Sequence, residues 1–306
     1  CLEMPAEPKG STFAGKVRHL SYPVRELGGL IFAYLGPDPD NPPPLPRYSP
    51  LIDRGGQRQI EPVRYCDYNW FNFFENSADP AHICILHRHA GYGEQTWGNH
   101  FFSYRDMPEF NFVETSYGMK VVMTKPGPTP DTEFADEMSL AFPSIIQVGD
   151  TEFVHAKLDA AKLMREGSQC EHMLFLTPND DEHFMVFTVD YYTGPDPDFF
   201  DRLRRMREQE KPKQEVKPYD RRKYIPYKGN IRREDVMAQA TQGLLGEREE
   251  QLGVSDRGVI LFRRLVREAI EAAWNGGVPK GVLSRENADE MVQLDSFAGV
   301  RPRARG

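Results

Sequence analysis

Cysteines are scarce in this sequence, and long apolar runs and basic clusters are missing from it. The four cysteines among 306 residues are scattered and form no CxxC pair, which argues against a disulfide framework and for a reducing cytoplasm. No apolar run approaches the roughly 18 residues that a membrane helix needs. The formal net charge of -8 argues against nucleic acid as a partner, because an acidic protein repels the phosphate backbone.

A proline-rich stretch divides the sequence into two unequal parts. Residues 36–47 contain six prolines, a density that excludes helix and inner strand and is typical of a stiff connector. We therefore assign residues 37–59 as a linker between a short β-rich segment, residues 1–36, and a main domain, residues 60–306. The first residue is Cys1 rather than Met, and the segment 1–36 is too small to be stable alone. We expect it to be the end of a truncated domain.

The middle of the main domain carries strand signals. Runs of β-branched and aromatic residues between polar or Gly/Pro-marked turns predict antiparallel strands over residues 110–115, 119–124, 142–148, 153–158, 171–177 and 184–192. No such pattern is seen over residues 277–306, which we expect to be irregular.

Helical signals flank these strands. Residues 196–215 and 231–246 are helical in composition, and residues 256–275 give the clearest helix, with Ser255 as its cap, one apolar stripe and Gly276 at its end. The order of helix, antiparallel strands and long C-terminal helix predicts an α+β domain in which a curved sheet grips a helix.

Two histidines in the aromatic-rich stretch 69–89 are candidates for metal binding. His82 and His87 are five residues apart, which on a regular helix places them roughly 140° apart. Both can face one ion only if the helix ends or distorts between them. Asp79 lies one turn before His82, close enough to orient its imidazole.

A third ligand must come from elsewhere in the chain. Two histidines with one carboxylate form the ligand set of non-haem Fe(II) sites that keep positions open for oxygen, and a similar set serves zinc hydrolases. Asp235 is our candidate for the carboxylate, and the adjacent Glu234 competes with it.

Three separated segments resemble the α subunits of Rieske non-haem iron oxygenases, in their phthalate-dioxygenase-like and O-demethylase-like branch. Residues 75–82 (ENSADPAH) with His87 are similar to the iron-binding motif of this family. Residues 1–36 are similar to the closing strands of its Rieske domain, and residues 233–239 and 252–266 to its C-terminal part. The resemblance covers nearly the whole chain.

The resemblance implies roles for individual residues. His82, His87 and Asp235 would bind a mononuclear Fe(II), and Asn76 would lie near the metal without being a firm ligand. Asp79 would bridge His82 to a cluster histidine of a neighbouring subunit and carry the electron path. The implied architecture is a Rieske domain joined to a helix-grip catalytic domain of the START and Bet v 1 type, assembled as a ring, commonly a homotrimer.

One departure from the family pattern concerns its second cofactor. The 2Fe-2S cluster of a Rieske domain is held by cysteine and histidine pairs, CxH and CxxH, and residues 1–36, the segment that resembles that domain, contain neither. We expect the cluster-binding part to be missing by truncation. In a full-length protein the cluster would receive electrons from NAD(P)H through a reductase or ferredoxin.

The implied reaction is the hydroxylation, dihydroxylation or O-demethylation of an aromatic compound with O2, and the sequence does not rank the three. An apolar pocket suits such a substrate, and the candidates for its wall are Phe142, Ile145, Ile146 and Val148. Two other functions stay open: a helix-grip module that binds an apolar ligand without a metal, and a zinc hydrolase.

Overall fold

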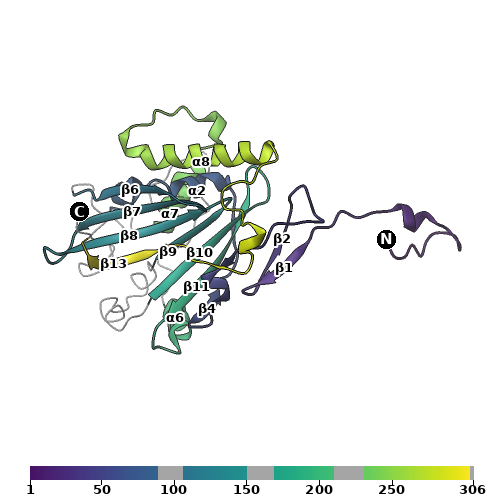
Figure 1. Cartoon of the computed structure of the whole chain (residues 1–306), viewed down its shortest axis with the longest axis horizontal. Helices are drawn as coiled ribbons and strands as arrows, with labels where there is room; N and C mark the ends of the chain where they lie inside the picture. The colour runs from purple at the N-terminus through teal and green to yellow at the C-terminus, as the bar shows by residue number, and fades with distance from the viewer. Residues whose placement is uncertain (89–105, 150–168, 210–230, 304–306) are drawn as a thin grey trace.

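An antiparallel sheet of nine strands forms the centre of the computed structural model, which describes residues 1–88, 106–149, 169–209 and 231–303. The strands follow the order β4-β11-β10-β9-β8-β7-β6, while β13 pairs with β8 and β5 pairs with β11 (Figure 1). Their bounds are β4 Gln57–Ile60, β5 Arg64–Cys66, β6 Glu109–Glu114, β7 Gly118–Pro126, β8 Thr132–Ala141, β9 Ile145–Gly149, β10 Gln169–Pro178, β11 Phe184–Thr193 and β13 Phe297–Pro302.

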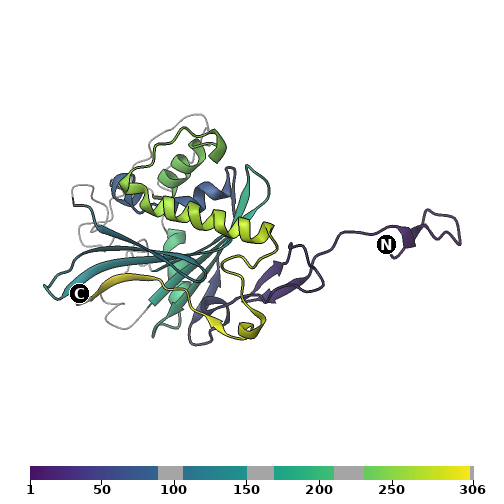
Figure 2. The ribbon, with the colours of Figure 1, turned by 45° about the horizontal axis from the view of Figure 1, so that its top comes forward.

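Helices lie against one face of this sheet (Figures 1 and 2). They are α2 (Trp70–Asn76), α3 (Ala81–Ile85), α7 (Ile231–Thr241) and the long α8 (Arg257–Trp274). Helix α6 (Phe199–Gln209) follows β11, and its Phe199 stacks on Tyr192 with 3.9 Å between ring centroids. The predicted α+β fold, in which a sheet grips a long C-terminal helix, is confirmed.

Each face of the sheet packs its own apolar cluster, because side chains alternate between the faces of a strand. The helix-facing cluster joins alternate residues of β7, β8 and β11 to α2 and α8, and its aromatic centre is Phe74, Phe142 and Phe262. Phe262 lies 4.9 Å from Phe74 between ring centroids. The cluster on the opposite face includes Ile145, Met173 and Phe175.

The N-terminal segment forms a small hairpin and an arm that points away from the sheet (Figures 1 and 2). Strands β1 (Val24–Leu27) and β2 (Leu30–Ala33) are joined by Gly28 and Gly29 at φ 62° and 86°, values that suit glycine in a two-residue turn. The division into residues 1–36, 37–59 and 60–306 stays a prediction.

Several elements differ from the prediction. Strand β8 was not predicted, since its sequence TEFADEMSLA is rich in charge; Glu133 and Glu137 both pair with Arg301 of β13. Residues 277–306 were wrongly expected to be irregular, because they hold β13 and the short strand β12 (Met291–Val292), which pairs with β3 (Arg47–Tyr48).

Helix α8 begins at Arg257, one residue later than predicted. Its N-cap is Asp256 without a side-chain hydrogen bond, so the assignment of Ser255 as the cap was wrong. Gly276 follows the helix with φ 72°, as predicted for its end.

The predicted strand 153–158 lies outside the described residues. Among the helices in the described part of the chain, none combines the length and apolar character needed to cross a membrane.

We expect the variant Phe262→Ala to lower the free energy of unfolding by about 3–5 kcal/mol, because it opens a cavity under α8. Chemical denaturation measures this difference. Ile270→Ala, on the same helix but 58% exposed, is the matched control and should change stability by less than about 1 kcal/mol. Equal losses for the two variants would contradict the packing described for α8.

Candidate metal centre

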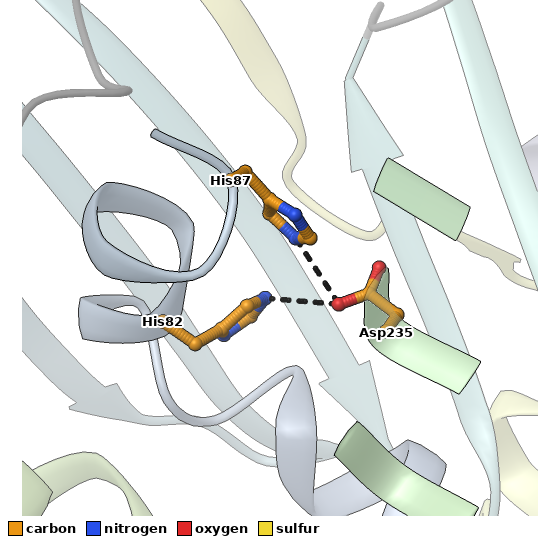
Figure 3. A group of neighbouring side chains, drawn as sticks. All are labelled: His82, His87 and Asp235. Carbon is orange, nitrogen blue, oxygen red and sulfur yellow. Dashed lines mark ion pairs between the residues drawn. The ribbon is translucent and has the colours of Figure 1, made fainter. Parts of the chain in front are cut away.

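The helix that carries the first histidine ends before the second. Helix α3 begins after Asp79 and Pro80 and ends at Ile85, so His82 lies within it and His87 lies two residues beyond its end. The chain can therefore turn His87 back toward His82, and Figure 3 shows the two rings converging. Their centroids are 5.3 Å apart.

Asp235 reaches both histidines from α7. Its Oδ1 lies 3.1 Å from Nε2 of His87 and 3.6 Å from Nε2 of His82 (Figure 3). One ligand atom from each of the three residues lies within 4.8 Å of the other two. The structure thus brings together the two histidines and the aspartate that the sequence proposed as ligands.

The chemistry of this donor set fits a cation. Oδ1 of Asp235 is buried and forms no hydrogen bond of good geometry among the described residues, although Nε2 of His87 lies near it. Nδ1 of His87 lies 2.8 Å from a carboxylate oxygen of Glu234, and Nδ1 of His82 contacts the main-chain oxygen of Asp79. With a proton on each Nδ1, both Nε2 atoms present lone pairs toward the carboxylate. A metal ion between these three atoms would relieve their repulsion.

Glu234 supports His87 from the side opposite Asp235. Both side chains are almost fully buried, with 2% of His87 and 3% of Glu234 exposed. Burial lowers the pKa of His87, but the carboxylates of Asp235 and Glu234 outweigh it and raise that pKa. Their field therefore favours a positive charge at the ring. Glu234, the competitor for the third ligand, contacts the nitrogen that points away from His82.

Sequence reasoning missed this orienting role of Glu234. The signal was available, because a histidine ligand commonly donates its second N–H to a carboxylate. Glu234 and Asp235 are adjacent at the start of α7. One carboxylate can therefore bind the ion, while the other accepts a hydrogen bond from an imidazole that binds the same ion. Which acid does which depends on the rotation of α7, and that is set by packing of Met237 and Ala240.

Asn76 and Asp79 both lie beside His82. The amide nitrogen of Asn76 lies 3.3 Å from Nε2 of His82. Asp79 is close enough to orient the imidazole, as expected from the sequence, and contacts it through its main-chain oxygen. Its carboxylate accepts a hydrogen bond from the backbone N–H of Ala81 at 3.1 Å. Burial raises the pKa of Asp79.

The four residues expected to line a substrate pocket do not share one face of the sheet. Ile146 and Val148 belong to the helix-facing side, where Phe142 packs against Phe262. Ile145 packs in the opposite cluster, because neighbouring residues of β9 point to opposite faces. Including Ile145 in that wall was an error, and the role of the other three stays a proposal.

A second buried histidine–carboxylate pair lies on the helix-facing side of the sheet. His172 on β10 and Asp190 on β11 are cross-strand partners, and Nδ1 of His172 lies 2.7 Å from Oδ1 of Asp190. Burial lowers the pKa of His172, but Cys170 and Asp190 outweigh it and raise that pKa well above its usual value. The Cys170 sulfur and the Asp190 carboxylate therefore favour the protonated form of the His172 imidazole, and we expect the pair to stabilise the fold.

Comparison with known proteins was made against family models, curated sequences and solved structures. No family model matches the chain. It is 27% identical over 309 residues to the 5,5'-dehydrodivanillate O-demethylase oxygenase subunit of Sphingobium sp. and 29% identical over 314 residues to the phenoxybenzoate dioxygenase subunit alpha of Ectopseudomonas oleovorans. Each alignment covers 97% of the chain but only 64% and 68% of the respective relative. The chain thus spans about two thirds of their length.

Solved structures share the fold. NdmA of Pseudomonas putida CBB5 with caffeine matches with a TM-score of 0.54 and 15% identity, over 84% of this chain and 63% of that chain. The terminal oxygenase of carbazole 1,9a-dioxygenase from Nocardioides aromaticivorans IC177 matches with a TM-score of 0.54 and 18% identity, over 85% and 70%.

The fold and the cluster of two histidines and one aspartate define a helix-grip domain with a candidate site for a mononuclear metal. Sequence matches to curated oxygenase subunits extend along nearly the whole chain. Together with the fold and the residue cluster, these matches identify the chain as a homologue of the oxygenase subunits of Rieske non-haem iron oxygenases. The family resemblance predicted from the sequence is confirmed.

The His172–Asp190 pair should stabilise the protein most at low pH. Because its folded-state pKa is raised, protonated His172 contributes fully below its unfolded pKa of about 6.5, and this contribution is lost as pH rises through the folded value. We expect Asp190→Asn to cost roughly 3–5 kcal/mol at pH 6 and less at pH 9. Urea denaturation across this range measures it.

The matched control is Asp180→Asn in the exposed His183–Asp180 pair, whose atoms are 2.8 Å apart. Solvent screens this pair, so its loss should change stability little at every pH. A penalty for Asp190→Asn that grows with pH would contradict the assignment of a charged His172.

Proposed function

We propose that this chain is the catalytic part of an oxygenase subunit that uses O2 and a mononuclear Fe(II) to hydroxylate, dihydroxylate or O-demethylate an aromatic compound. The observation that carries the proposal is the convergence of His82, His87 and Asp235 on one point. Iron held by two histidines and one carboxylate keeps coordination positions free and can, when reduced, bind and activate oxygen.

The residues around the proposed ligands hold them in place. Glu234 fixes the ring of His87, and the main-chain oxygen of Asp79 fixes the ring of His82, so each Nε2 is directed at Asp235. Preset ligands lose little conformational entropy when the ion binds. Asn76 borders the same space and can hydrogen-bond a polar ligand there.

The names of the relatives support an aromatic substrate. The two curated relatives are described as acting on 5,5'-dehydrodivanillate and on phenoxybenzoate, and others are described as phthalate and 3-chlorobenzoate dioxygenases. These compounds share an aromatic ring, and the proposal transfers only this chemical class to the present chain. Ile146 and Val148, on the helix-facing side, are proposed to contribute to an apolar pocket wall.

Electron supply requires partners beyond these residues. We propose that a 2Fe-2S Rieske cluster, whose ligand pairs are not found in residues 1–36, delivers electrons through Asp79 from a neighbouring subunit of a homotrimer. A reductase or ferredoxin would reload the cluster from NAD(P)H. Buried free thiols at Cys66, Cys84 and Cys170 support a reducing, cytoplasmic location.

Metal analysis of anaerobically prepared protein tests the ligand set. Wild-type protein should bind one iron per chain, and His82→Ala should lose it. Glu234→Gln should keep the site but weaken iron affinity roughly 10- to 100-fold, because a neutral amide replaces the negative carboxylate behind His87. His183→Ala, which removes a partly exposed histidine outside the proposed ligand set, is the matched control and should bind iron normally.

Two outcomes would contradict this assignment. Full iron occupancy in His82→Ala would show that the ion binds elsewhere. A wild-type protein that takes up no metal but binds apolar ligands would favour a non-catalytic helix-grip module, and one that selects zinc and turns over without oxygen would favour a hydrolase.

Oxygen uptake by the full-length protein with its reductase tests the reaction itself. We expect NAD(P)H-dependent uptake that is stimulated by at least one member of a panel of aromatic acids and methoxy-aromatics, and that is abolished in Asp235→Asn. Mass analysis of the product then distinguishes hydroxylation, dihydroxylation and demethylation. Uptake that is unchanged in Asp235→Asn would rule out this site as the oxygen-activating centre.

A further inference from the structure

A cysteine, a histidine and an aspartate line up on the helix-facing side of the sheet, where β10 begins. Cys170 and His172 are two residues apart on this strand, so their side chains point to the same face. Sγ of Cys170 lies 4.0 Å from Nε2 of His172, and Nδ1 of the same ring donates to Oδ1 of Asp190 at 2.7 Å. The imidazole therefore joins the thiol to the carboxylate, in the order nucleophile, base and orienting acid that activates a cysteine in enzymes.

The charges of this cluster favour a thiolate at Cys170. Burial lowers the pKa of His172, but the Cys170 sulfur and the Asp190 carboxylate raise it well above its usual value, so the ring is positive at neutral pH. A positive imidazole beside a thiol stabilises the thiolate, which is the nucleophilic form. At Cys66 on β5 the balance is different, because burial outweighs the charge of Arg64 and raises the pKa of that thiol.

Only a small reagent can approach the sulfur, because Cys170 is 2% exposed. Cys170 is the second residue of β10 and follows the exposed Gln169 at the first position of the strand. Its cross-strand partner is Tyr192, whose ring stacks on Phe199 at 3.9 Å between centroids. The sulfur thus lies one residue inside the edge of a closely packed region. Hydrogen peroxide is neutral and little larger than water, so it suits such a position better than a bulky electrophile does.

We propose that Cys170 is a redox modification site at which hydrogen peroxide converts the thiolate to a sulfenic acid. Sγ attacks one peroxide oxygen, so that an S–O bond forms while the O–O bond breaks. The sulfur loses two electrons and the peroxide gains them. The departing hydroxide takes the proton from Nε2 of His172 and leaves as water. Asp190 holds the resulting neutral ring through its Nδ1–H.

This inference is independent of the proposed function, because no iron takes part in the step. A sulfenic acid adds one oxygen atom beside Tyr192 and removes the thiolate that pairs with His172. Extra atoms in a packed interior force neighbours out of place. Oxidation should therefore lower the thermal stability of the chain, and a thiol reductant should restore it, since sulfenic acids are reversible.

Peroxide treatment of the folded chain, followed by mass analysis of each cysteine peptide, tests the site. The background is Cys1→Ser, which removes the exposed thiol, and a chelator excludes peroxide chemistry at iron. After catalase removes the peroxide, the chain is unfolded in excess dimedone, which traps every sulfenic acid. We expect Cys170 to be labelled roughly 10-fold faster than Cys66 or more, because only Cys170 has the activating imidazole at 4.0 Å.

Three variants assign the effect to the cluster. His172→Gln should lower the labelling of Cys170 roughly 10-fold and leave that of Cys66 unchanged, because it removes the positive ring. Asp190→Asn should lower it by a smaller factor. His183→Gln removes an imidazole whose Nδ1 lies 2.8 Å from the exposed Asp180, and as the matched control it should behave as wild type. Thermal unfolding of each variant checks the fold.

Two results would overturn the proposal. The first is equal labelling of Cys170 and Cys66 in the otherwise unchanged chain, a comparison that holds even if the His172 variant fails to fold. The second is labelling of Cys170 that stays at the original rate in a folded His172→Gln variant, which would show that the imidazole does not activate the thiol.

Discussion

Three candidate metal-ligand atoms that face one another in a partly buried space form the constraint on which the rest of the structure depends. Nε2 of His82, Nε2 of His87 and Oδ1 of Asp235 all carry lone pairs when each imidazole is protonated at Nδ1. Such an arrangement is repulsive without a positive charge at its centre. Binding of an ion should therefore also stabilise the fold, since the unfolded chain does not present the three ligands together.

The surrounding helices hold this arrangement against its own repulsion. The amide of Asn72 on α2 donates to the main-chain oxygen of Gln239 on α7 at 2.9 Å, and Tyr68 bonds the side chain of the same glutamine. Glu75, at the end of α2, is buried between Arg248 and Arg263, which ties α2 to α8. Each histidine ring is also held by a hydrogen-bonding neighbour of its own. The site therefore depends on the packing of α2, α7 and α8, and not on α3 alone.

Much of this arrangement could be predicted from the sequence, and the failures have physical reasons. Helix α8 was recognised because its apolar stripe includes Val259 and Phe262, which are buried. Strand β8 was missed because its charged Glu133 and Glu137 are paired with Arg301, a partner more than 160 residues away in sequence. Such long-range pairing leaves no local signal. The same limit applied to Glu234, whose contact with His87 depends on how α7 is rotated.

The most direct test of the central claim is a crystal structure of the Fe(II)-loaded chain, prepared without oxygen, with anomalous scattering recorded at the iron edge. The account predicts a single strong peak at bonding distance from Nε2 of His82, Nε2 of His87 and a carboxylate oxygen of Asp235, with Glu234 still on Nδ1 of His87. A peak at any other place, or these three side chains turned away from one another around no ion, would contradict it.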